Sequence, residues 1–117
     1  MICNAGAREV QANILAKSPN ARVAVYTVWF NMLPDDSRSR WKPVLTDQRV
    51  TNLWDEQRLV GRLLANGRGY AYGAIYDWYF LYGPEATWTD RPSPPQSSGT
   101  TVIDHSGQLR QAVQAVE

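Results

Sequence analysis

The segment RVAVYTVWF, residues 22–30, decides the fold, because nearly every residue in it is β-branched or aromatic. Such residues favour strands, and a strand that is apolar on both faces is typical of a sheet that is covered on both sides. The preceding residues, 4–17, have apolar side chains at helical spacing, and Pro19 ends that pattern because proline cannot continue a helix. A helix, a tight turn and a buried strand together predict an α/β layered fold.

A second helix is predicted after Asp55, whose carboxylate suits the N-cap position. Apolar residues then recur at helical spacing from Leu59 to Leu64, and Gly67 suits the C-terminal end of that helix. Residues 49–54, which come just before it, are either a short strand or an irregular segment.

A second strong strand is predicted over 75–82, IYDWYFLY, from its aromatic content. Because turn-forming residues follow over 83–86, we expect 87–88 to pair back with that strand in a β-hairpin. Residues 90–99 are rich in proline and serine and indicate an extended loop. Ser106 then suits the N-cap of a final helix, so the predicted order is helix, strand, helix, hairpin and helix.

The chain has 117 residues, which fits a single domain over 1–117. Its twelve Lys and Arg nearly balance its eleven Asp and Glu, and this argues against a nucleic-acid partner, which needs clustered positive charge. No stretch approaches the roughly 20 apolar residues that span a bilayer, and the first residues lack the apolar run of a signal peptide. We therefore expect no transmembrane segment and no signal peptide, and the sequence indicates no particular compartment.

The order of predicted elements resembles the thioredoxin fold from its active-site helix onward. More specifically, the chain is similar to redoxin-type thioredoxin-like proteins of bacteria, and the resemblance extends from Cys3 to about Val116. The residues that carry it are Cys3, Gly6-Ala7, Val10-Gln11, 25–29, Met32-Leu33, 47–50, Trp54-Asp55, Val60-Gly61, 77–79, 82–84 and Trp88.

The resemblance implies a thioredoxin-like three-layer α/β fold with a mixed β-sheet and the thiol-disulfide oxidoreductase activity of that family. Cys3 matches the second cysteine of the family's Cys-x-x-Cys motif and is the only cysteine in the chain. The first cysteine would stand one position before Met1, and the strand that precedes the motif is missing. Three explanations are open: a true start further upstream, an unusual codon such as selenocysteine at the first motif position, or a short chain with lost or altered redox chemistry.

Cys3 is the first candidate for a catalytic residue. A thiol at the N-terminus of a helix meets the positive end of the helix dipole, which favours the thiolate and lowers the pKa of the thiol. A single thiol forms a mixed disulfide but has no second thiol to resolve it. We therefore expect weak dithiol exchange or none.

Asp77 is the second candidate, because a carboxylate inside an aromatic strand has to face water or find a donor. One interpretation is that Asp77 lies at an exposed strand edge or forms an ion pair with arginine. The other, which the resemblance implies, is that Asp77 transfers a proton to or from the thiol.

His105 is the only histidine, so the chain offers no second histidine to complete a metal site with it, and the single cysteine is not near it in sequence. We therefore expect His105 in a solvated loop. The sequence indicates no cofactor.

The five Trp and six Tyr favour an alternative of another class. Core packing accounts for about half of them, and an exposed aromatic surface marks an interface. A sheet that lacks a strand also leaves unpaired amides and carbonyls that a second chain satisfies. The alternative is therefore a non-catalytic module that forms a homodimer or docks on a protein partner.

Overall fold

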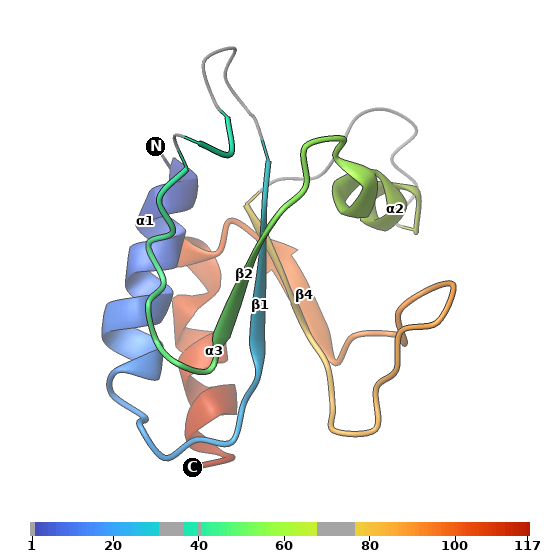
Figure 1. Cartoon of the computed structure of the whole chain (residues 1–117). Coiled ribbons are helices and arrows are strands. Elements are labelled where there is room, and N and C mark those ends of the chain that lie inside the picture. Colours follow the sequence, from blue (N-terminus) through green and yellow to red (C-terminus); the bar gives the residue numbers. More distant parts are fainter. Residues whose placement is uncertain (1, 31–36, 40, 68–76) are drawn as a thin grey trace.

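The first sheet consists of two parallel strands, β1 (Val25–Trp29) and β2 (Val50–Trp54) (Figure 1). The strands are in register along their whole length, so that Trp29 lies opposite Trp54 at their carboxyl ends. The strand predicted over 22–30 is therefore confirmed in its central part, and the segment before the second helix is a strand.

The structure is a computed structural model of the whole chain and describes residues 2–30, 37–39, 41–67 and 77–117. Predictions that fall on 31–36, 40 and 68–76, including the start of the strand predicted over 75–82, lie outside the described residues. The described part is a mixed α/β domain, as the sequence predicts.

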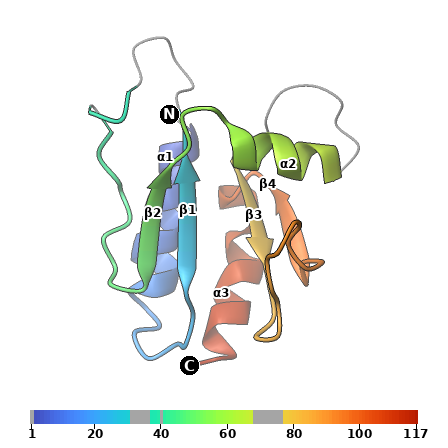
Figure 2. The ribbon, with the colours of Figure 1, turned by 45° about the vertical axis from the view of Figure 1, so that its right-hand side comes forward.

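Helices cover one face of the first sheet. α1 (Ile2–Glu9) continues as a π-helical segment, η1 (Val10–Leu15), and α3 (Ser106–Gln114) lies beside it on the same side of the sheet (Figures 1 and 2). Two clusters of buried apolar side chains join these helices to the rest of the domain. The buried residues are Ala7, Leu15 and Leu45 in one cluster and Ile14, Ala21 and Val113 in the other.

The prediction that the β1 strand is covered on both sides is wrong. The side chains of Tyr26, Val28 and Leu53 are 68%, 37% and 46% exposed, and in both strands they alternate with less exposed residues. α1, η1 and α3 all lie on the opposite face, and α2 (Leu59–Gly67) lies to the side of β1 and β2, near the level of their carboxyl ends, and does not cover them (Figure 2). Apolar residues on both faces of a strand therefore did not indicate burial on both.

The second sheet pairs β3 (Trp78–Leu81) with β4 (Ser97–Thr100) in antiparallel order. The prediction that 87–88 form the second strand of the hairpin is wrong. The Ser93 hydroxyl accepts a hydrogen bond from the Thr87 amide and donates one to the Thr87 carbonyl, at 2.9 and 3.0 Å. These bonds close a separate small loop, so the chain returns to β3 only afterwards.

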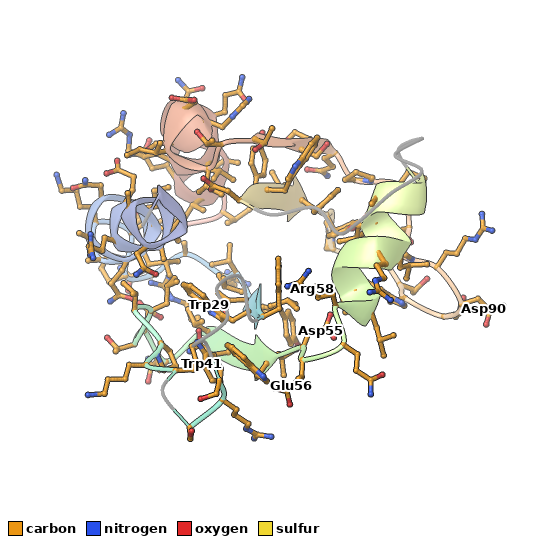
Figure 3. All side chains as sticks on the ribbon, turned by 90° about the horizontal axis from the view of Figure 1, so that it is seen from above. Trp29, Trp41, Asp55, Glu56, Arg58 and Asp90 are labelled. Atoms are coloured by element: carbon orange, nitrogen blue, oxygen red, sulfur yellow. The ribbon has the colours of Figure 1, made fainter. Side chains whose placement is uncertain are left out.

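The two sheets remain separate in the described part of the chain, so the single mixed sheet expected from the resemblance is not seen there. β3 lies on the side of β1 that is opposite to β2, and no ladder of backbone hydrogen bonds joins β1 to β3 among the described residues (Figures 2 and 3).

The Asp55 carboxylate binds the first amides of α2, but Asp55 does not hold the N-cap position that the sequence predicts, because the helix begins at Leu59. Its two carboxylate oxygens accept hydrogen bonds from the amides of Leu59 and Val60, at 3.0 and 2.8 Å. These amides open the helix and have no partner within it. The helix begins four residues after Asp55, because Arg58 takes a left-handed backbone conformation with φ of 59°.

The predicted cap of α3 is wrong in its chemistry. α3 begins at Ser106 and follows a short 3₁₀ segment, η2 (Ile103–His105). The Ser106 hydroxyl does not cap the helix but donates a hydrogen bond of 2.7 Å to Glu9 Oε1. A contact between α1 and α3 therefore took the place of the local cap.

Candidate functional site

The start of α1 and the carboxyl ends of β1 and β2 lie at the same end of the molecule (Figure 1). Ligand sites of α/β folds form at the carboxyl ends of parallel strands, which makes this end the natural candidate. Cys3 belongs to the first turn of α1. Its backbone is described, whereas its side chain lies outside the described part of the structure.

Asp77 approaches α1 from the second sheet. It directly precedes β3 with φ of 54°, and its Oδ1 accepts a hydrogen bond of 3.1 Å from the Val102 amide. A Cβ atom placed on Gly6 of α1 would lie 3.4 Å from that Oδ1 atom. The Asp77 carboxylate therefore lies beside the α1 backbone, where the closest approach to a Cβ atom on Gly6 would be that of Val102 Cβ, at 3.0 Å.

The other oxygen of Asp77, Oδ2, is buried and has no hydrogen-bond partner among the described residues. Among the described residues Asp77 forms no ion pair with arginine, and its side chain is partly buried rather than exposed. A buried acceptor without a donor costs about 1–3 kcal/mol. Such an atom is a place where a hydrogen-bond donor would be stabilised.

Cys3 and the Asp77 carboxylate are related through the first turns of α1. Cys3 and Gly6 are three residues apart, so they share one face of α1. The Asp77 carboxylate approaches that face at Gly6, which is about one helical turn after Cys3. The structure thus brings the two candidate residues of the sequence analysis to the same part of the molecule.

Three tryptophans gather at the carboxyl ends of β1 and β2. The ring centroids of Trp29 and Trp41 are 6.5 Å apart, and those of Trp41 and Trp54 are 5.5 Å apart, with tilted planes. Trp29 also packs against the cluster that contains Ala7 of α1. Trp29 and Trp41 are labelled at this end in Figure 3. The three indoles therefore form one aromatic cluster, which contacts the core beside α1 through Trp29.

Two of these indoles have unused polar atoms. The Trp29 N–H donates to Thr27 Oγ1 at 2.8 Å, whereas the buried N–H groups of Trp41 and Trp54 have no partner among the described residues. Sequence reasoning missed Trp41, because it stands alone in a polar segment without hydrophobic periodicity. Only its neighbours in space reveal it.

His105 is not a solvated loop residue, which corrects the sequence prediction. Its ring lies 5.5 Å from the Tyr79 ring, and its Nδ1 atom is 2.9 Å from the Thr101 carbonyl oxygen. The β4 strand leaves room for the ring at Gly99, where a Cβ atom would lie 2.6 Å from Nε2. His105 therefore packs between β4 and α3, and its contacts are structural.

A polar contact also joins α1 to α3 beside this site. Glu9 accepts hydrogen bonds from Ser106 and Asn13, each of 2.7 Å. The bond from Ser106, followed by that from Asn13, holds the pKa of the Glu9 carboxyl below its ordinary value. In the described part of the chain, no group of three or more His, Cys, Asp and Glu side chains is arranged to hold a metal ion.

Comparisons with known proteins find no match to this chain among family models, curated proteins or solved structures. Among the described residues, no helix has the length and apolar character needed to cross a membrane.

Proposed function

We propose that this chain is a thioredoxin-like domain that performs thiol chemistry at Cys3 without completing dithiol exchange. The observation that carries the proposal is the unpartnered, buried Oδ2 atom of Asp77, in a carboxylate that contacts α1 one turn after Cys3. A thiol at that turn has a proton acceptor close by and the positive end of the helix dipole around it.

The reaction that fits one thiol is the formation of a mixed disulfide. The Cys3 thiol gives its proton to Asp77 or to water, and the thiolate attacks a disulfide of another molecule. One sulfur–sulfur bond forms, the original one breaks, and the second sulfur leaves as a thiolate. Because Cys3 is the only cysteine, release requires an external thiol.

Thiol reactivity tests this proposal directly. We expect Cys3 of the folded protein to react faster with a small aromatic disulfide at pH 6 than it does in urea, because only the folded helix stabilises the thiolate. Mass spectrometry identifies the adduct, and Cys3→Ser provides the blank. Equal rates in the folded and unfolded protein would rule out activation by the fold.

We propose a second function of another class, a protein-interaction module, because of the exposed apolar face of the first sheet. Tyr26, Val28 and Leu53 form this face, and in the paired register Val28 lies directly opposite Leu53. Trp78 and Tyr79 of β3 are less suitable for an interface, because Trp78 is partly buried and Tyr79 is buried, with 9% exposure. Contiguous exposed apolar side chains mark interfaces.

Sedimentation velocity at increasing concentration tests the second function. We expect the wild-type chain to associate through this face, and the double variant Tyr26→Ser, Leu53→Ser to remain monomeric while keeping its circular dichroism spectrum. Cys3→Ser should associate like the wild type. A monomeric wild type, or a double variant that associates equally, would count against this function.

A further inference from the structure

The backbone of β1 has one edge that β2 does not use. The Val25 amide donates to the Arg49 carbonyl at 3.0 Å, and the Trp29 carbonyl accepts from the Asp55 amide at 2.6 Å. In a parallel ladder, alternate residues of a strand bond to the same neighbour. Val25, Thr27 and Trp29 therefore bond to β2, whereas the N–H and C=O groups of Tyr26 and Val28 point the opposite way.

The opposite side of β1 is the side on which β3 lies (Figures 2 and 3). Among the described residues, no backbone hydrogen bond reaches Tyr26 or Val28 from that side. Their side chains are 68% and 37% exposed. Two donors and two acceptors in strand geometry are thus open at one edge, with the spacing that another extended backbone matches.

We infer that this edge of β1 binds one extended peptide strand, which lies on the side of β1 facing β3. The inference rests on the second proposed function and names the partner for it. Backbone pairing would supply the affinity, and the side chains beside it would supply selectivity.

The lack of charged residues in the described strands indicates the chemistry of the partner. The described strands, VYTVW, VTNLW, WYFL and SSGT, contain no charged residue. On the face of the sheet that the helices cover, an acidic or basic side chain of the incoming strand would therefore meet no opposite charge on these strands and would lose its hydration. We infer that the partner strand is uncharged at the alternate positions that point to this face, with β-branched or aromatic side chains next to Tyr26 on the other face.

Amide hydrogen exchange tests the inference residue by residue. In the free protein we expect slow exchange at Thr27 and Trp29 and fast exchange at Tyr26 and Val28. The probe is a synthetic acetylated and amidated peptide, Lys-Val-Thr-Val-Thr-Val-Lys, whose lysines lie outside the pairing residues. At millimolar peptide, the exchange of Tyr26 and Val28 should slow by at least about tenfold, because both amides become hydrogen-bonded.

Two controls separate backbone pairing from nonspecific adhesion. The same peptide with N-methyl groups on alternate residues keeps its side chains but loses donors, and it should give no protection. Val28→Pro removes a donor only from the open edge and should abolish binding, whereas Val28→Ala keeps the donor and should bind. If Val28→Pro does not fold, the N-methylated peptide still decides the question.

Three results would overturn the inference: protection of Tyr26 and Val28 in the free monomer, no slowing at millimolar peptide, or equal binding of the N-methylated peptide. The second proposed function fails in a different measurement, when Tyr26→Ser with Leu53→Ser leaves association unchanged. Those two substitutions keep the backbone groups of the edge, so the two failures are distinguishable.

Discussion

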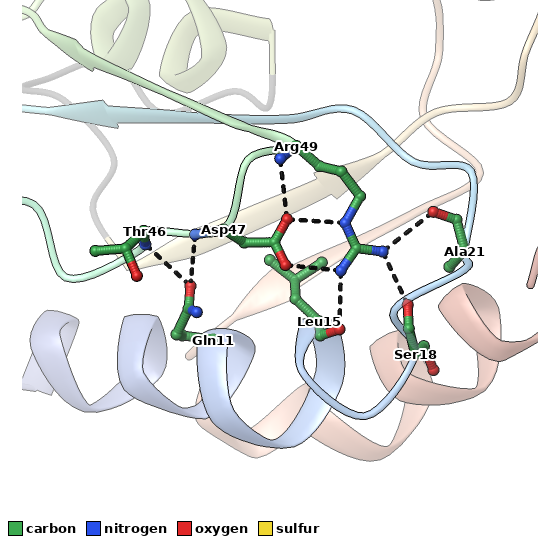
Figure 4. Close-up of polar contacts among 7 residues, drawn as sticks. All are labelled: Gln11, Leu15, Ser18, Ala21, Thr46, Asp47 and Arg49. Atoms are coloured by element: carbon green, nitrogen blue, oxygen red, sulfur yellow. Dashed lines mark hydrogen bonds and ion pairs between the residues drawn. The ribbon is translucent and has the colours of Figure 1, made fainter.

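Arg49 and Asp47 form an ion pair of 2.8 Å within the turn before β2 (Figure 4). The Arg49 guanidinium also donates to the carbonyl oxygens of Leu15, Ser18 and Ala21, at 2.8, 2.8 and 3.1 Å. These carbonyls come from the last turn of η1 and the loop after it, where helix geometry leaves acceptors unpaired. One side chain therefore ends a helix and positions a strand.

Removing this guanidinium should destabilise the domain strongly. Both side chains are largely buried, with 15% and 16% exposure, so Arg49→Met leaves the carboxylate and the carbonyls without donors. We expect a loss of about 2–4 kcal/mol in the free energy of unfolding, measured by urea denaturation. Arg62→Met, at an exposed position of α2, is the control and should change it little. Equal effects of the two substitutions would contradict the role of Arg49.

The same ion pair predicts how stability depends on pH. Hydrogen bonds from the Arg49 side chain and then from its backbone lower the pKa of Asp47 from 3.8 to about 2. Because the folded state lowers this pKa, the charged form contributes stability above about pH 4, and the contribution is lost as the pH falls towards about 2. Urea denaturation between these pH values should show a steeper loss for the wild type than for Asp47→Asn. Parallel curves would contradict the prediction.

Asp77 should influence the thiol of Cys3. A neighbouring carboxylate raises the pKa of a thiol, so Asp77→Asn should shift the pH profile of Cys3 alkylation to lower pH. The asparagine keeps the oxygen that accepts from Val102. Asp90→Asn, in an exposed loop, should leave the profile unchanged. A profile that Asp77→Asn does not move would separate Asp77 from the thiol.

Gly6 of α1 and Gly107 of α3 provide a matched test of packing at the candidate site. A Cβ atom at Gly6 would lie 3.0 Å from Val102 Cβ, whereas one at Gly107 would have no atom within 4 Å. Alanine favours a helix over glycine by up to about 1 kcal/mol. We expect Gly107→Ala to raise the unfolding free energy and Gly6→Ala to lower it. A stabilising Gly6→Ala would show that α1 is not held closely against Val102.

The tryptophan cluster predicts a contrast between two substitutions. Trp29→Phe removes a hydrogen bond to Thr27, whereas Trp41→Phe removes a buried N–H that has no partner in the described part of the chain. Both changes also lose ring area. We expect Trp29→Phe to cost about 1 kcal/mol more than Trp41→Phe in urea denaturation. The reverse order would mean that the Trp41 N–H has a partner in the folded protein.

Local patterns were sufficient where neighbouring residues decide the structure. The β-branched run of β1 and the helical spacing before it depend on residues close in sequence, and both are confirmed. The Asp55 side chain likewise bonds to the start of α2, from a position three residues before the N-cap. The hairpin partner was not predictable in the same way, because the Ser93 contact with Thr87 closes another loop first. The pattern of apolar residues does not indicate whether the chain pairs with β3 directly after the first turn or only after a further loop.

The sequence by itself determined the α/β class, the positions of its strongest strand and helices, and Cys3 in the first turn of a helix. Only the tertiary structure decided that one face of β1 is uncovered, that Asp77 reaches the α1 backbone, and that Arg49 joins three carbonyls. The physical reason is that propensity and periodicity report the conformation of neighbouring residues. Burial and hydrogen-bond partners depend on segments that are distant in sequence, such as the 31 residues or more that separate Arg49 from Leu15 and Ser18.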